Sequence, residues 1–205
     1  MLKICSPNET DYPKFPRVID ITMGEYVFSD FYPVHSDSFA TCLGVVIGAV
    51  NGFGVCVGHL DPLAGPTGSF YKSSLDAMIK TLLTKGRAAK FDILFFKDGY
   101  GAVGKFGLVE YVKTRFKNIV VEIHDRTDAA AKNVRYDEVI AQPSALHSAY
   151  VGLHIQGSGA SEWDDGRTVM RNQADGGSNL AASNLGRVRE IVFDGNDFKS
   201  AESRE

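Results

Sequence analysis

Residues 40–62 read A-T-C-L-G-V-V-I-G-A-V-N-G-F-G-V-C-V-G-H-L-D-P and predict a β-hairpin. Its two apolar runs flank Asn51-Gly52, a dipeptide that favours a type I′ turn because both central residues of that turn need φ > 0. Both runs are apolar on both faces, which is typical of central strands covered on each side. We therefore expect the fold to be built around a sheet that contains this hairpin.

The register of this hairpin predicts a cysteine and a histidine on one face. A two-residue turn places Gly44 opposite His59 and makes Cys42 a diagonal neighbour of His59, about 7–8 Å away at Cα. A three-residue loop would put the two side chains on opposite faces, whereas a four-residue loop, Asn51–Gly54, keeps them together. Gly44 would then leave open space beside the pair for a substrate, or simply suit sheet packing.

A cysteine and a histidine at this spacing are candidates for nucleophilic catalysis. A thiol needs a base because only a few per cent is ionised at neutral pH, and His59 would accept its proton and later protonate the leaving group. The alternative is that Cys42 is a small buried hydrophobe, as most free cysteines are. The candidates to orient the imidazole are polar residues that precede the hairpin: His35, Ser36, Asp37, Ser38 and Thr41.

The composition excludes several classes of protein. The chain has 205 residues, a net charge of −3 and no basic excess, which argues against nucleic-acid binding. It has no apolar run of about 18 residues, so we expect no membrane insertion, and no signal-peptide pattern at its start. Three cysteines make no disulfide framework. Synthesis in the cytoplasm is expected, with secretion into a host cell by a signal-peptide-independent route as an alternative; the oligomeric state stays open.

Local patterns predict helices packed on a sheet. Ser73 and Asp76 resemble a capping box that starts a helix ending at Lys85, before Gly86. The remaining predictions are two strands within 17–29, a loop at 29–38, strands at 91–97 and 119–124, a helix at 105–117, weaker strands at 134–141 and 150–155, a loop-rich segment at 156–186, a strand at 187–194, an extended arm at 1–16 and a polar tail.

Two other kinds of site have weak support. His59, His124 and Cys42 could ligate zinc, but the spacing of a zinc motif is missing. Residues 99–104, G-Y-G-A-V-G, have the spacing of a nucleotide-binding loop between a strand and a helix, without the context of a first Rossmann strand. No metal or cofactor is expected.

The order of motifs resembles the chemoreceptor glutamine deamidase family, CheD. M-G-E-Y-V-F-S at 23–29 precedes the cysteine strand, and the histidine follows the cysteine at the family's spacing of 17 residues (59 − 42 = 17). A hydroxyl residue six positions before the cysteine completes the family's triad, and that position holds Ser36. The likeness covers residues 17–125. It differs at Ala40-Thr41-Cys42, where the family has Gly-Ser-Cys, and at Asp61, which the family lacks between leucine and proline.

This resemblance implies the fold and the function. The fold would be an α/β (α+β) mixed-sheet sandwich with helices packed on it, shared with cytotoxic necrotizing factor. Residues 1–205 would be one catalytic domain, with a core at 17–125 and a partly loop-rich extension at 126–205. Cys42, His59 and Ser36 would hydrolyse the side-chain amide of an exposed glutamine in a partner protein. A bacterial toxin or effector fits this function as well as a chemotaxis enzyme. The alternatives are a metal-dependent or nucleoside-processing relative, or a non-catalytic binding protein.

Overall fold

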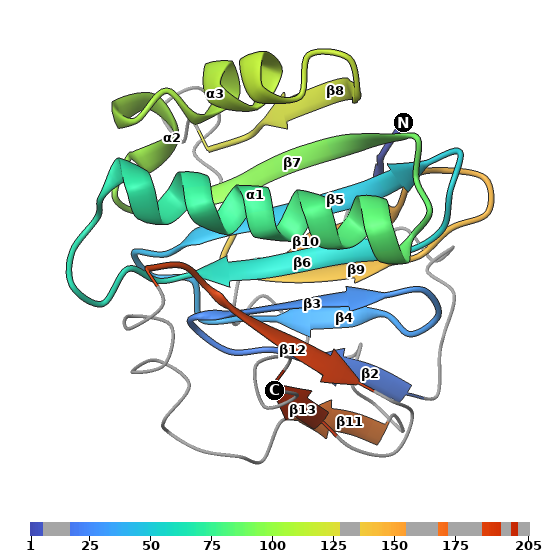
Figure 1. Ribbon diagram of the computed structural model, residues 1–205. Helices are drawn as coiled ribbons and strands as arrows, with labels where there is room; N and C mark the ends of the chain where they lie inside the picture. Colours follow the sequence, from blue (N-terminus) through green and yellow to red (C-terminus); the bar gives the residue numbers. More distant parts are fainter. Residues whose placement is uncertain (6–16, 128–135, 155–167, 172–185, 194–197, 201–205) are drawn as a thin grey trace.

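A computed structural model describes residues 1–5, 17–127, 136–154, 168–171, 186–193 and 198–200. In this part of the chain two mixed β-sheets and three helices form an α/β protein (Figure 1). The sheets lie one behind the other, and the longest helix runs across the outer face of one of them. This agrees with the predicted class of helices packed on mixed sheets.

The two sheets combine neighbours that are far apart in sequence. The six-stranded sheet has the order β1(Lys3–Cys5), β10(Tyr150–His154), β9(Glu138–Gln142), β4(Val34–Ser36), β2(Arg17–Asp20), β11(Thr168–Arg171). The seven-stranded sheet has the order β13(Phe198–Ser200), β12(Arg189–Phe193), β3(Glu25–Ser29), β6(Val55–Leu60), β5(Leu43–Val50), β7(Lys90–Asp98), β8(Val120–Asp125). Both sheets contain parallel and antiparallel pairs.

The hairpin of β5 and β6 has the predicted register. Gly44 pairs with His59, and Ile47 pairs with Cys56. The strands are joined by the four residues Asn51–Gly54, so the type I′ turn is wrong: Asn51 has φ 54° and Gly54 has φ 98°, but Gly52 does not have positive φ. The predicted two-residue turn and the observed four-residue loop both place Cys42 and His59 on the same face, so the error in the turn does not change their predicted placement.

The predicted first helix is α1(Gly68–Lys85), and it starts five residues earlier than expected. Thr67 caps it by accepting a hydrogen bond from the backbone N–H of Phe70 (3.3 Å). Ser73 and Asp76 therefore lie within the helix, and the capping-box prediction is wrong. Gly86 follows the last residue as predicted, where a Cβ would meet the carbonyl oxygens of Phe53 and Leu82.

Two further local predictions are corrected. The helix expected at 105–117 is two short ones, α2(Ala102–Lys105) and α3(Leu108–Arg115), because Gly107 adopts φ 58° between them. The loop expected at 29–38 contains strand β4, which pairs with β2 and β9. Strand β4 has only three residues and pairs with segments that are distant in the sequence. Its residues therefore form no local pattern that predicts a strand, because β-strand preference depends on neighbouring strands.

The predicted C-terminal extension contributes strands to both sheets. Strands β9 and β10 are close to the predicted ranges and lie beside β4 and β1, while β12 pairs with β3. Strand β11 lies inside the segment that we expected to be loop, and β13 lies inside the predicted tail. The remaining predicted loop, residues 156–167 and 172–185, and most of the N-terminal arm, residues 6–16, are outside the described residues.

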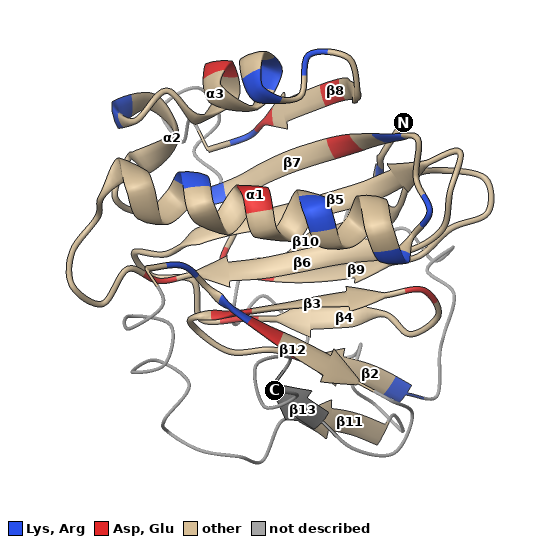
Figure 2. Cartoon of the chain, viewed as in Figure 1, with Lys and Arg blue, Asp and Glu red and all other residues tan. Residues whose placement is uncertain are grey.

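Two apolar cores hold these layers together. One lies between the sheets and includes Val34, Val46, Val57 and Val139. The other lies between the seven-stranded sheet and the helices, and it includes Ile47, Leu75 and Leu82. Strands β5 and β6 contribute to both cores, as their two-sided apolar pattern predicted. Charged residues of both signs are interspersed on the outward faces of the helices (Figure 2).

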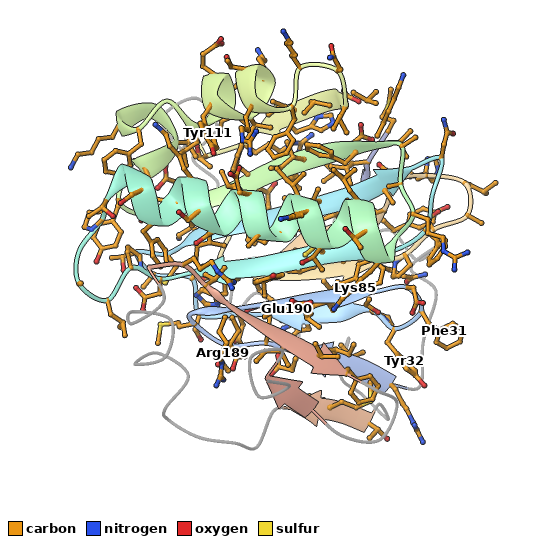
Figure 3. All side chains as sticks on the ribbon, viewed as in Figure 1. Phe31, Tyr32, Lys85, Tyr111, Arg189 and Glu190 are labelled. Carbon is orange, nitrogen blue, oxygen red and sulfur yellow. The ribbon has the colours of Figure 1, made fainter. Side chains whose placement is uncertain are left out.

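Strand β12, which lies between β13 and β3, is tied to the helix layer by an ion pair. Lys85 at the end of α1 bonds to Glu190 of β12 (Figure 3). The next residue, Arg189, bonds to Glu25 of β3 at 2.9 Å, with both side chains largely buried. One ion pair thus joins β12 to α1, and the other joins β12 to its neighbour β3 within the seven-stranded sheet.

Candidate active site

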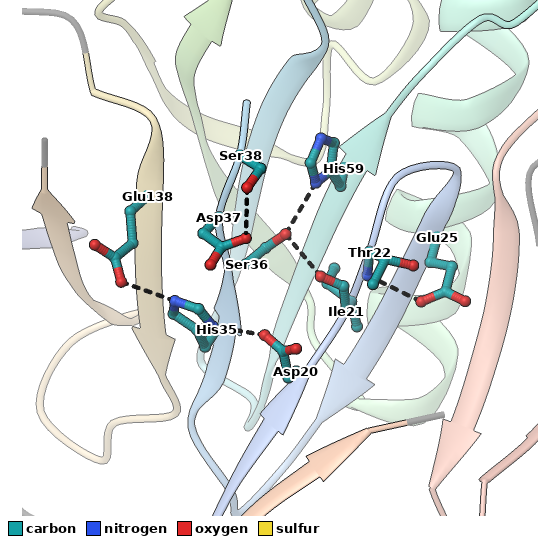
Figure 4. Close-up of polar contacts among 10 residues, drawn as sticks. All are labelled: Asp20, Ile21, Thr22, Glu25, His35, Ser36, Asp37, Ser38, His59 and Glu138. Atoms are coloured by element: carbon teal, nitrogen blue, oxygen red, sulfur yellow. Dashed lines mark hydrogen bonds and ion pairs between the residues drawn. The ribbon is translucent and has the colours of Figure 1, made fainter. Parts of the chain in front are cut away.

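Strand β4 brings Ser36 to His59 across the space between the sheets. The Ser36 hydroxyl lies 3.0 Å from His59 Nδ1 and donates its hydrogen to the backbone carbonyl of Ile21 (2.9 Å) (Figure 4). A hydroxyl has only one hydrogen to donate. The serine oxygen must therefore accept from His59, so Nδ1 carries the proton and Nε2 keeps a free lone pair.

This pair is fully buried, and so is the second ring nitrogen of His59, Nε2. Ser36 and His59 are 0% and 1% exposed. Among the described residues, nothing forms a hydrogen bond with His59 Nε2. Buried polar atoms without a partner are uncommon and call for an explanation, such as a functional role. The orphan Nε2 is therefore the candidate base.

Cys42 immediately precedes β5 and faces the same core as His59. It lies in the apolar cluster between the sheets, 2% exposed, and its carbonyl oxygen accepts a hydrogen bond from the N–H of Gly99 (3.4 Å). The same-face prediction is thus confirmed. The thiol does not hydrogen-bond His59 Nε2 in this state, so the two side chains are neighbours on one face without a formed dyad.

Burial keeps both reactive groups neutral. It raises the pKa of Cys42 to about 12, with a further increase from Asp61, while the backbone N–H groups of Cys42 and Thr41 and the Lys97 ammonium act in the opposite direction. Burial also lowers the pKa of His59 to about 3. A neutral thiol and a neutral imidazole are therefore the resting forms at pH 7.

Aromatic rings close the site. Phe39 stacks on the imidazole of His59, with ring centroids 3.8 Å apart and planes 17° apart, and it contacts Phe96 edge-on at 5.0 Å. A Cβ on Gly44 would lie 2.3 Å from the Phe96 ring. The expectation of open space beside Gly44 is therefore wrong: Phe96 fills it, and the glycine serves packing. Sequence reasoning also missed Phe39, because an aromatic residue in a polar loop gives no sign of what it covers.

The other candidate orienting residues have different partners. His35 points to the opposite face of β4, where Nδ1 lies 2.6 Å from Asp20 and Nε2 lies 2.9 Å from Glu138 (Figure 4). Burial alone would lower the pKa of His35, but its bonds to Asp20 and Glu138 outweigh burial and raise it. Asp37 accepts a hydrogen bond from Ser38 at the surface. Thr41 is exposed.

Glu25 of the Gly-Glu element lies beside the candidate base. It pairs with His59 across β3 and β6, so both side chains are on the same face. Its carboxylate accepts hydrogen bonds from Arg189 and from the backbone N–H of Thr22 (3.0 Å). These bonds direct the carboxylate away from the imidazole, which suits a structural role that fixes the end of β3.

The alternative sites gain no support from the described residues. No group of three or more histidine, cysteine, aspartate or glutamate side chains is placed to hold a metal among them. In the glycine-rich segment 99–104, the Asp98 carboxylate caps α2 by accepting from the N–H groups of Ala102 and Val103, which occupies the place of a phosphate. No helix in the described ranges is long and apolar enough to cross a membrane.

Fold and site together define a mixed α/β protein in which a buried serine–histidine pair faces a buried cysteine. No protein-family model matches the chain, and no curated protein sequence matches it.

Two charged residues beside Cys42 should tune its reactivity in opposite directions. We expect Asp61→Asn to lower the thiol pKa and Lys97→Gln to raise it, because the carboxylate opposes and the ammonium favours the thiolate. Both side chains are half-buried. Each pKa unit changes the thiolate fraction about tenfold. The measurement is the pH dependence of Cys42 alkylation by iodoacetamide, followed by peptide mass spectrometry; shifts of the same sign in both variants would contradict this electrostatic account.

Proposed function

We propose that this protein is a cysteine-dependent protein-glutamine deamidase. The observation that carries the proposal is the Ser36–His59 bond, which leaves the Nε2 lone pair free on the face that holds Cys42. A histidine oriented by a third residue and placed near a nucleophile is the general arrangement of acyl-transfer sites. The resemblance in spacing to the chemoreceptor deamidases supplies the substrate class, a glutamine side-chain amide.

In the first stage, His59 Nε2 takes the proton of the Cys42 thiol as the sulfur forms a bond to the amide carbon. Backbone N–H groups can stabilise the resulting oxyanion. Those of Thr41 and Cys42 are the candidates, because they already lower the pKa of the Cys42 sulfur. The carbon–nitrogen bond then breaks, and the proton on Nε2 passes to the leaving nitrogen, which departs as ammonia.

In the second stage, water replaces ammonia and the enzyme is regenerated. Nε2 takes a proton from the water as its oxygen attacks the thioester carbon. The carbon–sulfur bond breaks, the proton returns to the sulfur, and glutamate remains in the target protein. Ser36 holds the imidazole in one tautomer throughout. These steps need no metal or cofactor.

The target would be a folded protein with an exposed glutamine. Departures from the chemoreceptor deamidases at residues 40–42 and at Asp61 lie next to the candidate nucleophile, which favours a changed substrate surface. We propose a bacterial toxin or effector as the role, with chemoreceptor deamidation as the alternative.

A direct test is ammonia release from candidate target proteins. We expect wild type to release ammonia, Cys42→Ala to fall to background, and Cys56→Ala to remain active. Cys56 is a matched control because it is a buried cysteine on the other face of the same hairpin. Equal release by wild type and Cys42→Ala from every active target would overturn the proposal.

One observation favours a second function, that of a non-catalytic binding protein. The Cys42 thiol is buried, has a raised pKa and makes no bond to His59, as expected of a cysteine that only packs. Iodoacetamide labelling of Cys42 in the folded protein at near-neutral pH separates the two functions. Labelling confined to unfolding conditions, both in wild type and in Phe39→Ala, which removes the ring stacked on His59, would favour the binding protein.

A further inference from the structure

The loop that connects Ser36 to Cys42 buries one side chain of its residues 37–41, that of Phe39. Its residues Ser38, Ala40 and Thr41 are exposed and Asp37 is half-buried, whereas Phe39 is 1% exposed. This loop joins two proposed members of the triad, so movement of Phe39 would change access to both.

Phe39 covers the face of the candidate base. Its ring stacks on the His59 imidazole at a centroid distance of 3.8 Å and also contacts Phe96. Phe39 and Cys42 lie in the same buried cluster. An amide carbon that reacts with the sulfur, while Nε2 handles the proton, must approach both groups from this cluster. In the described state, the Phe39 ring is part of what fills that space.

We infer that Phe39 occupies the slot that receives the substrate carboxamide, and that the loop 37–40 swings outward when a target protein docks. This inference rests on the proposed function and deepens it. The slot is walled by the flat imidazole of His59 and by the Phe96 ring, which both contact the Phe39 ring. A planar primary amide can take the place of the flat Phe39 ring against the imidazole face.

The geometry of the loop is consistent with displacement. Ser38 adopts φ 61°, a left-handed conformation that strains a residue with a side chain. The Phe39 N–H donates to the Asp137 carbonyl at a long 3.3 Å, and the Ala40 N–H donates to the carbonyl of Ser38 within the same loop. Displacement thus breaks few backbone hydrogen bonds and exposes one ring, which a docked protein can cover again.

The first experiment measures alkylation of Cys42 by iodoacetamide in wild type and Phe39→Ala. We expect the variant to react at least about tenfold faster, because the reactive fraction of molecules rises when the ring is removed. Cys56 reports global unfolding within the same sample, since it is 0% exposed in the other core; it should stay unlabelled. Phe31→Ala is the matched control, because the Phe31 ring is 61% exposed and lies outside the buried cluster that holds Phe39 and Cys42.

A second variant and a competitor make the outcome decisive. Phe39→Leu keeps an apolar anchor, so its alkylation rate should lie between those of wild type and Phe39→Ala. It replaces Phe39→Ala in the experiment if that variant unfolds. N-acetyl-glutamine methylamide should slow the alkylation of the opened variant, and its glutamate counterpart should not. No acceleration in either variant, or equal protection by both competitors, would overturn the inference. Labelling that is faster in the variants and slowed by the amide, without ammonia release from any target, would support the slot and contradict the deamidase function.

Discussion

Replacement of His35 by alanine is expected to lower the free energy of unfolding by about 3–5 kcal/mol, as measured by urea denaturation. His35 bridges the carboxylates of Asp20 on β2 and Glu138 on β9, and all three side chains are buried. Removal of the imidazolium leaves two buried carboxylates without their shared partner. His147→Ala, at a half-buried histidine outside this cluster, should cost less than about 1 kcal/mol.

The pH dependence of this effect has a defined sign. The folded-state pKa of His35 lies above its ordinary value of 6.5, so its stabilising contribution is complete below pH 6.5 and is lost as pH rises through the raised pKa. The difference between wild type and His35→Ala should therefore shrink on going from about pH 6 to well above the raised value. A difference that is small at both pH values, or that grows with pH, would contradict the charged bridge.

Replacement of Ser36 by alanine is expected to lower turnover of the proposed reaction by about 100-fold, with the KM for the target protein little changed. Ser36 contacts the base and the Ile21 carbonyl, so its loss releases the His59 tautomer without removing a group that touches substrate. The measurement is ammonia release at saturating and limiting target concentrations.

Ser36→Thr is the matched control for this variant. Threonine retains the hydroxyl and is the usual residue in the family that the sequence resembles, so turnover should stay within about tenfold of wild type. Equal turnover of wild type and Ser36→Ala would contradict the role given to this serine. A rise in KM with unchanged turnover would place Ser36 in target binding instead.

His59 should make the protein less stable in acid. Burial lowers the pKa of His59 to about 3, while in the unfolded chain its pKa has the ordinary value of 6.5. The unfolded state therefore binds more protons between these values, and stability falls as pH is lowered from 6.5 toward 3. His59→Gln should flatten this part of the stability curve, which urea denaturation across the range would show.

The sequence was sufficient for features encoded within one hairpin. The alternation of apolar residues in β5 and β6 set the register of the hairpin. A two-residue turn and a four-residue loop both place Cys42 and His59 on the same face. The position of Ser36 came from the resemblance, because the residue lies on β4, a three-residue strand whose partners are β2 and β9. No local pattern distinguishes such a strand from a loop.

The packing of Phe39 and Phe96 around His59 and Gly44 could not be predicted, because it depends on contacts between distant segments. Phe96 follows a regular strand pattern, yet its ring fills the space over Gly44 only because a bulge at Gly44/Val45 shifts β5 against β7. His35 and Ser36 are adjacent and both polar, and only the pairing of β4 decides which one reaches His59. The start of α1 was predicted too late for a local reason. Thr67 caps the helix, but the next two residues, Gly68 and Ser69, are weak helix formers, so the sequence does not indicate a helix there.

In the proposed reaction, Cys42 hydrolyses a glutamine amide through a covalent thioester. The most direct measurement is peptide mass spectrometry of target proteins incubated in ¹⁸O-labelled water with wild type, Cys42→Ala or Cys56→Ala. The account predicts a glutamine converted to glutamate with ¹⁸O in its new carboxylate, produced by wild type and Cys56→Ala and missing with Cys42→Ala. Conversion that persists in Cys42→Ala would contradict it.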